Sequence, residues 1–370
     1  MPFEIDFLPV GNGDRSGDAI AVRYGQPGAY TVMVYDGGSK EAGSKLVKHI
    51  REYYQTDYVD HVVNSHPDAD HASGLSVVLE ELKVGTLWLH QPWHYSHIIS
   101  DYFKDGRITS QSLKTRLQEK MATAYQLEQL AVEKGIEIKE PFQGVVIGAF
   151  HVLSPEKGWY IHDLIADFQK SPEQKRVEAA ADFSIVDRLN KFIAEGAKKA
   201  ATWVAEKWEL ELLREDVETT AENDSCTILY GYMEDFKEGI LLTGDAGVKA
   251  LTRAVDYLDY YNVSAPQHIK FIQVPHHGSR HNVSSSILDR ILGPRFPAKP
   301  EEYEKVAFVS AGKGSTTHPR KMVANAFQRR GAKVIATQGK TTRHHRGMPA
   351  REGWISATPL EFFSQVEAWD

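Results

Sequence analysis

The sequence predicts an α/β fold in which layered sheets are flanked by helices. Short β-rich runs alternate with helical stretches through most of the 370 residues, and this alternation favours an α/β layered fold over an all-β sandwich. Hydrophobic residues make up 42% of the chain, which is enough for a sizeable core. Several apolar strands also end in polar loops rich in Gly, His and Asp. We expect one domain over residues 1–370.

Composition excludes several classes of protein. Cys226 is the single cysteine, so a disulfide-stapled secreted scaffold is excluded. No apolar run reaches the roughly 18–20 residues that a membrane-spanning helix needs. The opening MPFEIDFLPVG lacks the basic and then apolar pattern of an export signal. With a net charge of −7, the chain is expected to be cytoplasmic and to have no membrane partner.

The first part of the chain reads as strands joined by short helices. Strand patterns cover PFEIDFLPV, AIAVRYG and YTVMVYDGG, with a glycine-rich turn at 11–14 between the first two. A helical stretch, SKEAGSKLVKHIREYYQ, precedes the apolar strand YVDHVVNS. We then expect a helix from about Gly74 to Leu82 and the strand VGTLWLH.

Two long helical blocks, at about 91–135 and 156–222, interrupt the strand pattern and are interpreted as insertions in one α/β core. Gly135 is suited to end the first block. The strands expected around and after the blocks are IEIKE, VVIGAFHVLSP, SCTILYGYM, GILLTGD, HIKFIQVPHH, KVAFVSAG and KVIATQ. Helices are expected at VKALTRAVDYLDYY and from Pro319 to Arg330, and the segment GWISA to PLEFF closes the chain.

The most informative motif is SHPDADH, which begins at Ser65. It places four candidate metal ligands, His66, Asp68, Asp70 and His71, between an apolar strand and a helix. A loop at a strand end can direct alternate side chains to different sides, so two residues can face one ion and two another. Neutral imidazoles and ionised carboxylates suit a two-metal site. The alternative is a polar loop with a helix N-cap at Asp70.

Three later strands end in similar residues. LLTGD places Asp245 just past an apolar strand, and VPHHGS places His276 and His277 there. SAGKGSTTHP ends with His318 at the entrance of a helix. Each could be a capped turn, but together with SHPDADH they predict one site, because α/β sheets collect functional residues at strand ends.

HPDADHASGL, LLTGD and VPHHGS, in this order, resemble the motifs of the metallo-β-lactamase superfamily. Within it, the chain most resembles the branch of the hydrolase domain of ComEC, the competence DNA-uptake channel. GNGDRSGDAIAV, YDGG, LSP, NDSCTIL and SAGKGSTTHP extend that resemblance over nearly the whole chain apart from the two insertions. The resemblance implies an αββα metallo-β-lactamase sandwich with a dinuclear metal site at one edge, and hydrolysis as the reaction.

The resemblance also implies roles for single residues. The implied metal ligands are His66 and Asp68 for the first ion, Asp70 and His71 for the second, Asp245 as the bridge and His276 as the closing ligand of the second ion. Asp36 matches a carboxylate that supports the site from below. The superfamily commonly has His where Asp68 stands, and another His on the loop that carries Asn223, which we place as a supporting residue.

These two departures make the first site richer in oxygen, which shifts its preference from zinc toward manganese or magnesium. We expect two divalent ions, Zn²⁺ or Mn²⁺, with the choice open. Asp70 and Asp245 would orient the activated water as catalytic residues. His318, Ser279 or Lys313 would assist the leaving oxygen. His277 either supports His276 near the substrate or exchanges roles with it.

The preferred substrate is a phosphodiester, most concretely DNA. Residues 310–353 hold ten Lys and Arg against one acid, which predicts a face for an anionic ligand. Arg343 and Arg346, which flank two histidines, are predicted to grip substrate phosphates at the rim of the cleft. The alternatives are a cyclic nucleotide or another small phosphodiester, an ester or lactone, and a metal-binding regulatory protein without catalysis.

The second insertion carries the large apolar residues Phe192, Ile193, Trp203 and Trp208. In a helix they must bury an apolar stripe. We expect them to form a lid near the metal site or the surface of a homodimer, with completion of the monomer core as the alternative.

Overall fold

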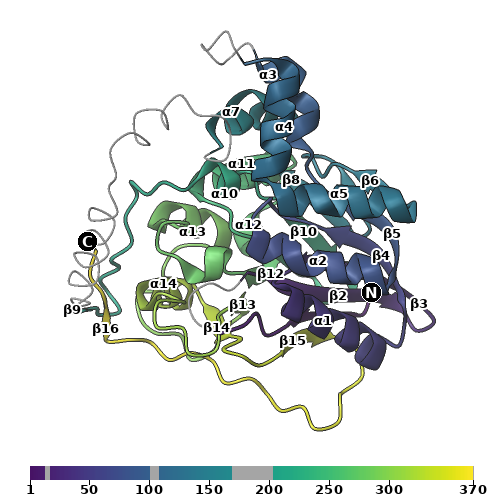
Figure 1. Cartoon of the computed structure of the whole chain (residues 1–370). Coiled ribbons are helices and arrows are strands. Elements are labelled where there is room, and N and C mark those ends of the chain that lie inside the picture. The colour runs from purple at the N-terminus through teal and green to yellow at the C-terminus, as the bar shows by residue number, and fades with distance from the viewer. Residues whose placement is uncertain (13–16, 101–107, 169–202, 370) are drawn as a thin grey trace.

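Two seven-stranded sheets lie face to face in this computed structural model, which describes residues 1–12, 17–100, 108–168 and 203–369 (Figure 1). The first sheet has the order β15 (Thr342–Arg346), β1 (Phe3–Phe7), β2 (Ala19–Gln26), β3 (Ala29–Gly37), β4 (Tyr58–Val63), β5 (Lys83–Trp88) and β6 (Glu137–Lys139). The second has the order β14 (Ala332–Ala336), β13 (Lys305–Val309), β12 (Ile269–Gln273), β11 (Glu238–Leu242), β10 (Ile228–Met233), β8 (Phe150–Ser154) and β7 (Val146–Ile147).

A core of aromatic and branched side chains fills the space between the sheets. Alternate residues of β1 point into it, and Phe7 packs edge-on against Phe271 of β12 and Phe308 of β13. The intervening residues Glu4 and Asp6 face the other side of the first sheet, yet both are fully buried. A strand with both faces buried and carboxylates on one of them requires buried positive partners.

Helices cover the outer faces of both sheets, so the molecule has four layers. On the first sheet these are α1 (Lys40–His49), α2 (Ala69–Glu81) and α5 (Ala122–Lys134), and on the second α11 (Val248–Tyr260), α13 (Ser285–Leu292) and α14 (Lys321–Arg329) (Figure 1). The αββα sandwich expected from the sequence is confirmed. Among the described helices, none combines the length and apolar content needed to cross a bilayer.

The first insertion is helical as expected. It contains η2 (Pro92–Tyr95), α3 (Ser96–Ile99), α4 (Ser110–Lys120) and α5, and Gly135 ends α5 with a left-handed φ of 67°. Thr109 caps α4 by accepting a hydrogen bond from the Ser112 amide at 3.1 Å. These helices stack beyond α2 at one end of the molecule (Figure 1).

The second insertion is helical at its start, where α6 (Lys157–Trp159), η4 (Tyr160–Leu164) and α7 (Ile165–Asp167) form one continuous run. The description resumes at the strand β9 (Trp203–Ala205), and residues 206–220 contain no helix, so the expected helical block is wrong over 203–220. Phe192 and Ile193 lie outside the described residues. Trp203 is half-exposed on β9, and Trp208 packs on Phe362. The described part therefore joins the C-terminal segment, and the homodimer stays a prediction.

The end of the chain also differs from expectation. Residues 353–364 form no strand. They run along the sheet edges, where the Leu360 amide donates to Val334 O of β14 at 2.9 Å. Only β16 (Gln365–Glu367) is a strand there, and it pairs with β9. The remaining short elements are η1 (Ile50–Tyr54), α10 (Ala221–Asp224), η5 (Glu234–Phe236), α12 (Ala265–His268) and η6 (Pro275–Gly278).

Glycines let α2 approach the end of β3, which positions the SHPDADH loop. A Cβ on Gly74 would lie 1.9 Å from the carbonyl oxygen of Gly37, and one on Gly17 would lie 1.5 Å from that of Asp70. Neither contact is possible with a side chain present. The Gly17–Asp18 segment, the end of β3 and the start of α2 are thereby packed together.

Candidate metal centre

The carboxyl ends of strands from both sheets meet at one edge of the sandwich. Asp36 lies at the end of β3, and the loop with His66 follows the parallel strand β4. In the second sheet, Asp245 follows β11 and His276 and His277 follow the parallel strand β12. Parallel strands present their carboxyl ends on one side, and this topology brings together residues more than 200 positions apart.

Asp36 and Ser65 hold the rings of His66 and His71. Asp36 accepts hydrogen bonds from the Ser65 amide at 2.7 Å and the Ser65 hydroxyl at 2.5 Å, and its Oδ2 lies 2.9 Å from His71 Nδ1. Ser65 Oγ lies 2.9 Å from His66 Nδ1. Both Nδ1 atoms are therefore engaged, which leaves the two Nε2 atoms for the centre of the site, the usual arrangement of metal-binding histidines.

Four imidazoles surround the carboxylate of Asp245, and we call these five residues the imidazole cluster. His276 Nδ1 lies 3.1 Å and His71 Nε2 lies 3.3 Å from Asp245 Oδ2. The Nε2 atoms of His66 and His277 each lie 3.9 Å from an oxygen of the same carboxylate. Asp245 is 3% exposed, so this charge is removed from water.

The donor atoms in this cluster fit a divalent cation. His66 Nε2, His71 Nε2 and Asp245 Oδ1 are buried and have no hydrogen-bond partner among the described residues. Three groups bring one donor atom per residue within 4.8 Å of each other: Asp36, His66 and His71; Asp70, His71 and His277; and Asp18, Asp245 and His277. Unpaired buried polar atoms are costly, and a shared cation would satisfy them together.

The electrostatics of the cluster lead to the same conclusion. Burial raises the pKa of Asp245, but His276, His71 and His277 lower it well below its usual range. Burial lowers the pKa of His71, yet Asp245 and Asp36 raise it well above its usual range. Burial lowers the pKa of His277 to about 3, so its ring is neutral with a lone pair to offer. The buried carboxylates thus require positive charge, from protons or from metal ions.

Three residues of the site hold a left-handed backbone conformation that side chains normally avoid. The φ angles are 58° at Asp36, 47° at His276 and 55° at His277. Such conformations cost on the order of 1–3 kcal/mol each and concentrate at functional sites. Both histidine rings lie beside Asp245, with ring centroids 5.6 Å apart.

His277 is the more deeply placed of the two histidines. It is 4% exposed and belongs to two of the donor groups, whereas the His276 side chain is one-third exposed and belongs to none. His276 Nδ1 lies 2.8 Å from Asn223 Nδ2 as well as beside Asp245. His277 is therefore the buried member of the pair, whereas His276 and Asn223 lie at the mouth, and the metal ligand among the two histidines stays a prediction.

Asp68 and Asp70 occupy the outer side of the centre. Asp68 is the N-cap of α2, in place of the alternative cap Asp70, and its Oδ2 lies 3.7 Å from His66 Nε2. Asp68 belongs to none of the three donor groups found among the described residues. Asp70 is exposed in the first turn of α2 and reaches the group with His71 and His277.

The sequence reasoning missed Asp18. This residue is 1% exposed, accepts a hydrogen bond from Gln273 Nε2 at 2.8 Å, and joins Asp245 and His277 in one donor group. Burial raises its pKa to about 7. The available signal was a carboxylate between a glycine-rich turn and the start of the apolar strand AIAV, whereas Asp245 follows the end of its strand.

The residues expected to meet the substrate lie around this centre. The ring of His318 lies 6.4 Å from that of His277, and His318 Nδ1 lies 3.0 Å from Thr317 Oγ1. Ser279 and His276 line a cavity of about 420 Å³ together with Asn223 and Asn282. Lys313 is exposed on the loop that leads to His318. This cavity gives a small substrate access to the mouth of the imidazole cluster.

Arg343 and Arg346 were expected to contact substrate at the rim of the site. The structure places them elsewhere. They lie on β15, where Arg343 pairs with the buried Glu4 and Arg346 Nε lies 3.0 Å from Glu238. Glu238 begins β11, whereas Asp245 follows the other end of that strand. Arg346 is therefore at the opposite end of the second sheet from the imidazole cluster.

Several arginines of the basic segment 310–353 form ion pairs inside the protein. Arg329 and Arg330 of the α14 end are fully buried, and they bind Glu206 at 3.2 Å and Glu211 at 2.7 Å, respectively. Arg351 binds Asp6 at 2.8 Å. The excess of Lys and Arg in 310–353 thus compensates acids from other segments and does not form a continuous basic face.

Comparison with known proteins adds evidence on the family. A family model described as the Metallo-beta-lactamase superfamily matches residues 13–119, a segment that contains Asp36 and the SHPDADH motif. Over this segment the chain is similar to the metallo-β-lactamase superfamily. Comparison with curated proteins found no match.

Two solved structures show weak overall likeness. The metallo-beta-lactamase fold protein YhfI from Bacillus subtilis is 11% identical with a TM-score of 0.40, over 93% of this chain and 100% of that one. A long form RNase Z from yeast is 10% identical with a TM-score of 0.37, over 92% of this chain and 41% of that one. The match to the superfamily model, like the two layered sheets, is consistent with a metallo-β-lactamase fold.

Proposed function

We propose that this protein is a metal-dependent hydrolase of the metallo-β-lactamase superfamily that cleaves phosphodiesters, most concretely DNA. One observation carries the hydrolase proposal. The unpartnered Nε2 atoms of His66 and His71 face the buried carboxylate of Asp245, with neutral His277 on its other side. Buried polar atoms without hydrogen-bond partners are costly, and divalent ions would satisfy them together.

In this proposal His66, His71, His277 and Asp245 hold the ions, and Asp18 joins them. Bound divalent ions would supply a water of lowered pKa and positive charge for the attacked group. Asp36 fixes the His71 ring through Nδ1, so that Nε2 stays directed at the centre. Asp70, exposed at the rim, accepts the proton of the attacking water, and His318 gives a proton to the leaving oxygen.

A phosphodiester substrate is supported by the resemblance to the ComEC branch and by exposed cationic groups near the centre. Lys313 lies on the loop between β13 and His318, and that loop packs directly on the site because Gly278 contacts Pro319. Arg343 and Arg346 no longer support a DNA substrate. The cavity beside His276 also suits a small phosphodiester, such as a cyclic nucleotide, which is the second candidate.

Hydrolysis assays on the purified protein test this proposal. The protein, stripped of metal and reloaded with Mn²⁺ or Zn²⁺, is incubated in parallel with single-stranded DNA, duplex DNA, RNA, cyclic nucleotides and a carboxylic ester. Cleavage of DNA that is lost in Asp245→Asn supports the proposal. Cleavage of cyclic nucleotides alone selects the second candidate. Ester cleavage alone, or activity that persists in Asp245→Asn, contradicts it.

A further inference from the structure

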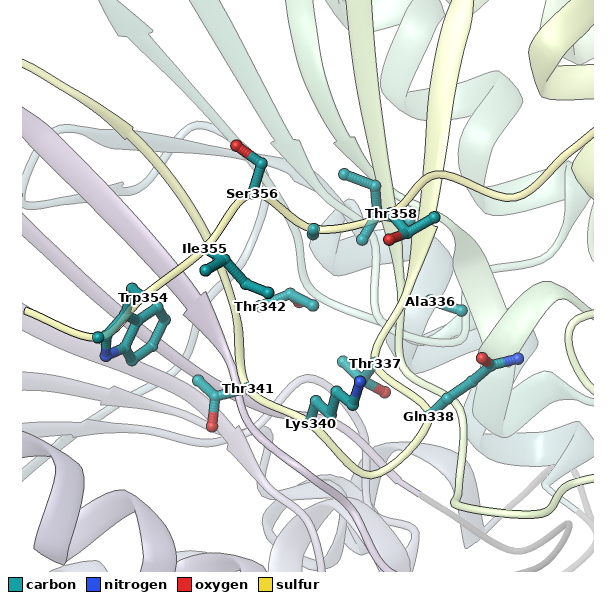
Figure 2. Close-up of a pocket in the computed structure, with 13 residues that line it drawn as sticks. Ala336, Thr337, Gln338, Lys340, Thr341, Thr342, Trp354, Ile355, Ser356 and Thr358 are labelled. Atoms are coloured by element: carbon teal, nitrogen blue, oxygen red, sulfur yellow. The ribbon is translucent and has the colours of Figure 1, made fainter. Parts of the chain in front are cut away.

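A second cavity, of about 400 Å³, lies between the free edges of the two sheets. β14 and β15 are the edge strands on this side, and the turn between them forms one wall. The other wall is residues 353–358, which we call the C-terminal strap (Figure 2). No metal-centre residue lines this cavity, so it is a separate feature of the molecule.

The cavity wall is polar and positively charged. Thr342 is 6% exposed, and its Oγ1 has no hydrogen-bond partner among the described residues although it lines the cavity. Lys340 and Thr341 lie in the same wall, and Ser356 and Thr358 lie in the strap (Figure 2). The lining includes no carboxylate. An unpartnered hydroxyl and an ammonium in one wall without carboxylates suit a polar anionic ligand.

The cavity also has apolar surface, which suits a ligand with an apolar part beside its polar, anionic part. Trp354 and Ile355 of the strap line the cavity together with Ile335 of β14. Trp354 is fixed by the Tyr53 ring, edge-on at 5.5 Å, and by the Arg351 guanidinium 4.6 Å from its centroid. A rigid indole and an exposed Ile355 next to hydroxyls fit a nucleoside, which has an apolar base face and a polar sugar.

The cavity is physically joined to the metal centre by the loop that carries Lys313 and His318. The Ala311 amide donates to Thr337 Oγ1 at 2.8 Å, and the Thr337 amide donates to Val309 O at 3.0 Å. The stem of Lys313 lies on Gly339, where an added Cβ would come within 2.8 Å of it. Lys313 and Lys340 therefore lie next to each other between the two sites.

The strand order of the second sheet gives the separation between the cavity and the metal centre. β11, which leads to Asp245, and β14, which leads to the cavity, are three strand spacings apart with their carboxyl ends at the same edge. At about 4.8 Å per spacing this is about 14 Å. No ion pair involves Lys313 or Lys340 within the described part of the chain. Two exposed lysines without ion-pair partners among the described residues thus lie on the side of the cavity that faces the metal centre.

We propose that the cavity binds a nucleotide of an extended single-stranded polynucleotide, away from the bond that is cleaved. Lys340 and Lys313 contact phosphates between the two sites, Thr342 Oγ1 bonds the sugar or base, and Trp354 packs on the base. This inference rests on the proposed function and names its substrate class. A base that packs on Trp354 inside the cavity cannot at the same time be paired in a duplex, so single strands are preferred over duplex.

Binding and hydrolysis, measured separately, test the inference. Fluorescence anisotropy with a labelled 12-nucleotide single strand is compared for wild type, Lys340→Ala and Thr342→Val. Lys333→Ala is the matched control, because Lys333 is exposed on the same strand β14 but does not line the cavity. We expect about 10-fold weaker binding for each cavity variant, and for Lys340→Ala a log–log salt slope reduced by about 0.7, one phosphate contact.

Cleavage of bis(p-nitrophenyl) phosphate, which is too small to reach the cavity, should be unchanged in both variants. Wild-type affinity in both Lys340→Ala and Thr342→Val, or an equal loss in Lys333→Ala, overturns the inference. These outcomes are distinct from failure of the proposed function, which appears as absence of metal-dependent cleavage of any phosphodiester. Because anisotropy needs no turnover, the cavity is tested in either case.

Discussion

Two groups of buried carboxylates in this protein are compensated in opposite ways. In the imidazole cluster, Asp245 is surrounded by four rings, and the Nε2 atoms of His66 and His71 have no hydrogen-bond partner among the described residues. In what we call the guanidinium cluster, Glu4 and Asp6 of β1 bind Arg23, Arg343 and Arg351. Both groups are withdrawn from water, but only the second has permanent positive charge from its own chain.

The guanidinium cluster has the features of a structural ion network. Asp6 also accepts a hydrogen bond from Tyr54 at 2.8 Å, and His49 Nε2 lies 3.1 Å from it. Arg351 binds both acids at 2.8 Å, and its guanidinium lies 4.6 Å from the Tyr53 ring centroid. Arginine is suited to this role because its charge is fixed and its planar group satisfies several oxygens.

Histidine has the opposite properties, and the contrast explains the difference in function. A neutral imidazole offers one lone pair and no fixed charge, so a carboxylate among imidazoles still needs a cation. Arginine in the same positions would neutralise Asp245 and leave no lone pair for a metal. The comparison supports the proposal that the imidazole cluster binds metal and that the guanidinium cluster is part of the scaffold.

The largest expected effect is at the imidazole cluster. Asp245→Asn retains the shape of the side chain but removes the charge that four rings surround. We expect loss of bound metal and a fall in turnover of about 1,000-fold or more, because several kcal/mol of transition-state stabilisation depend on the metals. Metal content by mass spectrometry and the rate of phosphodiester cleavage check this. Full metal content and activity in this variant would show that the site is misplaced.

The corresponding change in the guanidinium cluster should affect stability and not metal. Arg351→Ala leaves Asp6 and Glu4 buried with fewer partners, and breaking such a pair costs about 3 kcal/mol or more. Urea unfolding should show this loss, while Lys333→Ala stays within about 0.5 kcal/mol of wild type. Metal content per folded molecule should be unchanged. A loss of metal without a loss of stability would reverse the roles of the two clusters.

Asp36 tests whether positioning contributes to metal affinity. Asp36→Asn keeps the hydrogen-bonding shape around Ser65 and His71 but removes the charge that fixes the His71 ring. We expect metal affinity to fall about 10- to 100-fold, as for other partners of metal-binding histidines. Competition with a metallochromic chelator measures it. Unchanged affinity would mean that the His71 ring is held by packing alone.

The smallest effect concerns pH. Burial raises the pKa of Asp6, but the opposite effect of His49 and Arg351 is larger. The pKa is therefore lowered from an ordinary value of 3.8 to about 2. The unfolded chain therefore takes up the proton more readily than the folded chain. This stability, about 2 kcal/mol, is present above about pH 5 and lost as the pH falls through 4 to 2.

Unfolding free energies of wild type and Asp6→Asn between pH 2 and pH 6 check this expectation. The wild-type curve should fall more steeply with acid than that of the variant. Parallel curves for the two proteins would show that Asp6 titrates normally and that its partners do not stabilise the charged form.

The layered fold and the strand ends that carry the site could be predicted from the sequence, because both depend on local pattern. Asp245, His66 and His71 follow apolar strands and stand next to glycine or helix starts, so their position along the chain shows their place in the sheet. Asp18 shares that pattern at the start of a strand instead of its end, and it was missed for this reason.

Long-range pairing could not be predicted. Arg343 and Arg351 have the composition of an exposed basic segment, and only the addition of β15 next to β1 places them on Glu4 and Asp6. The different burial of His276 and His277 could not be predicted either, because both residues hold left-handed backbone angles that the sequence does not reveal. The helical character of 156–222 was wrong at β9, because the pairing of β9 with β16 involves residues more than 150 positions away.

The central claim is that the imidazole cluster binds divalent metal, and anomalous diffraction from crystals soaked in Mn²⁺ tests it most directly. The account predicts anomalous peaks within coordination distance of His66, His71, His277 and Asp245, and none at the guanidinium cluster. Soaked crystals with no peak among these four side chains, or with the metal bound elsewhere, would contradict it.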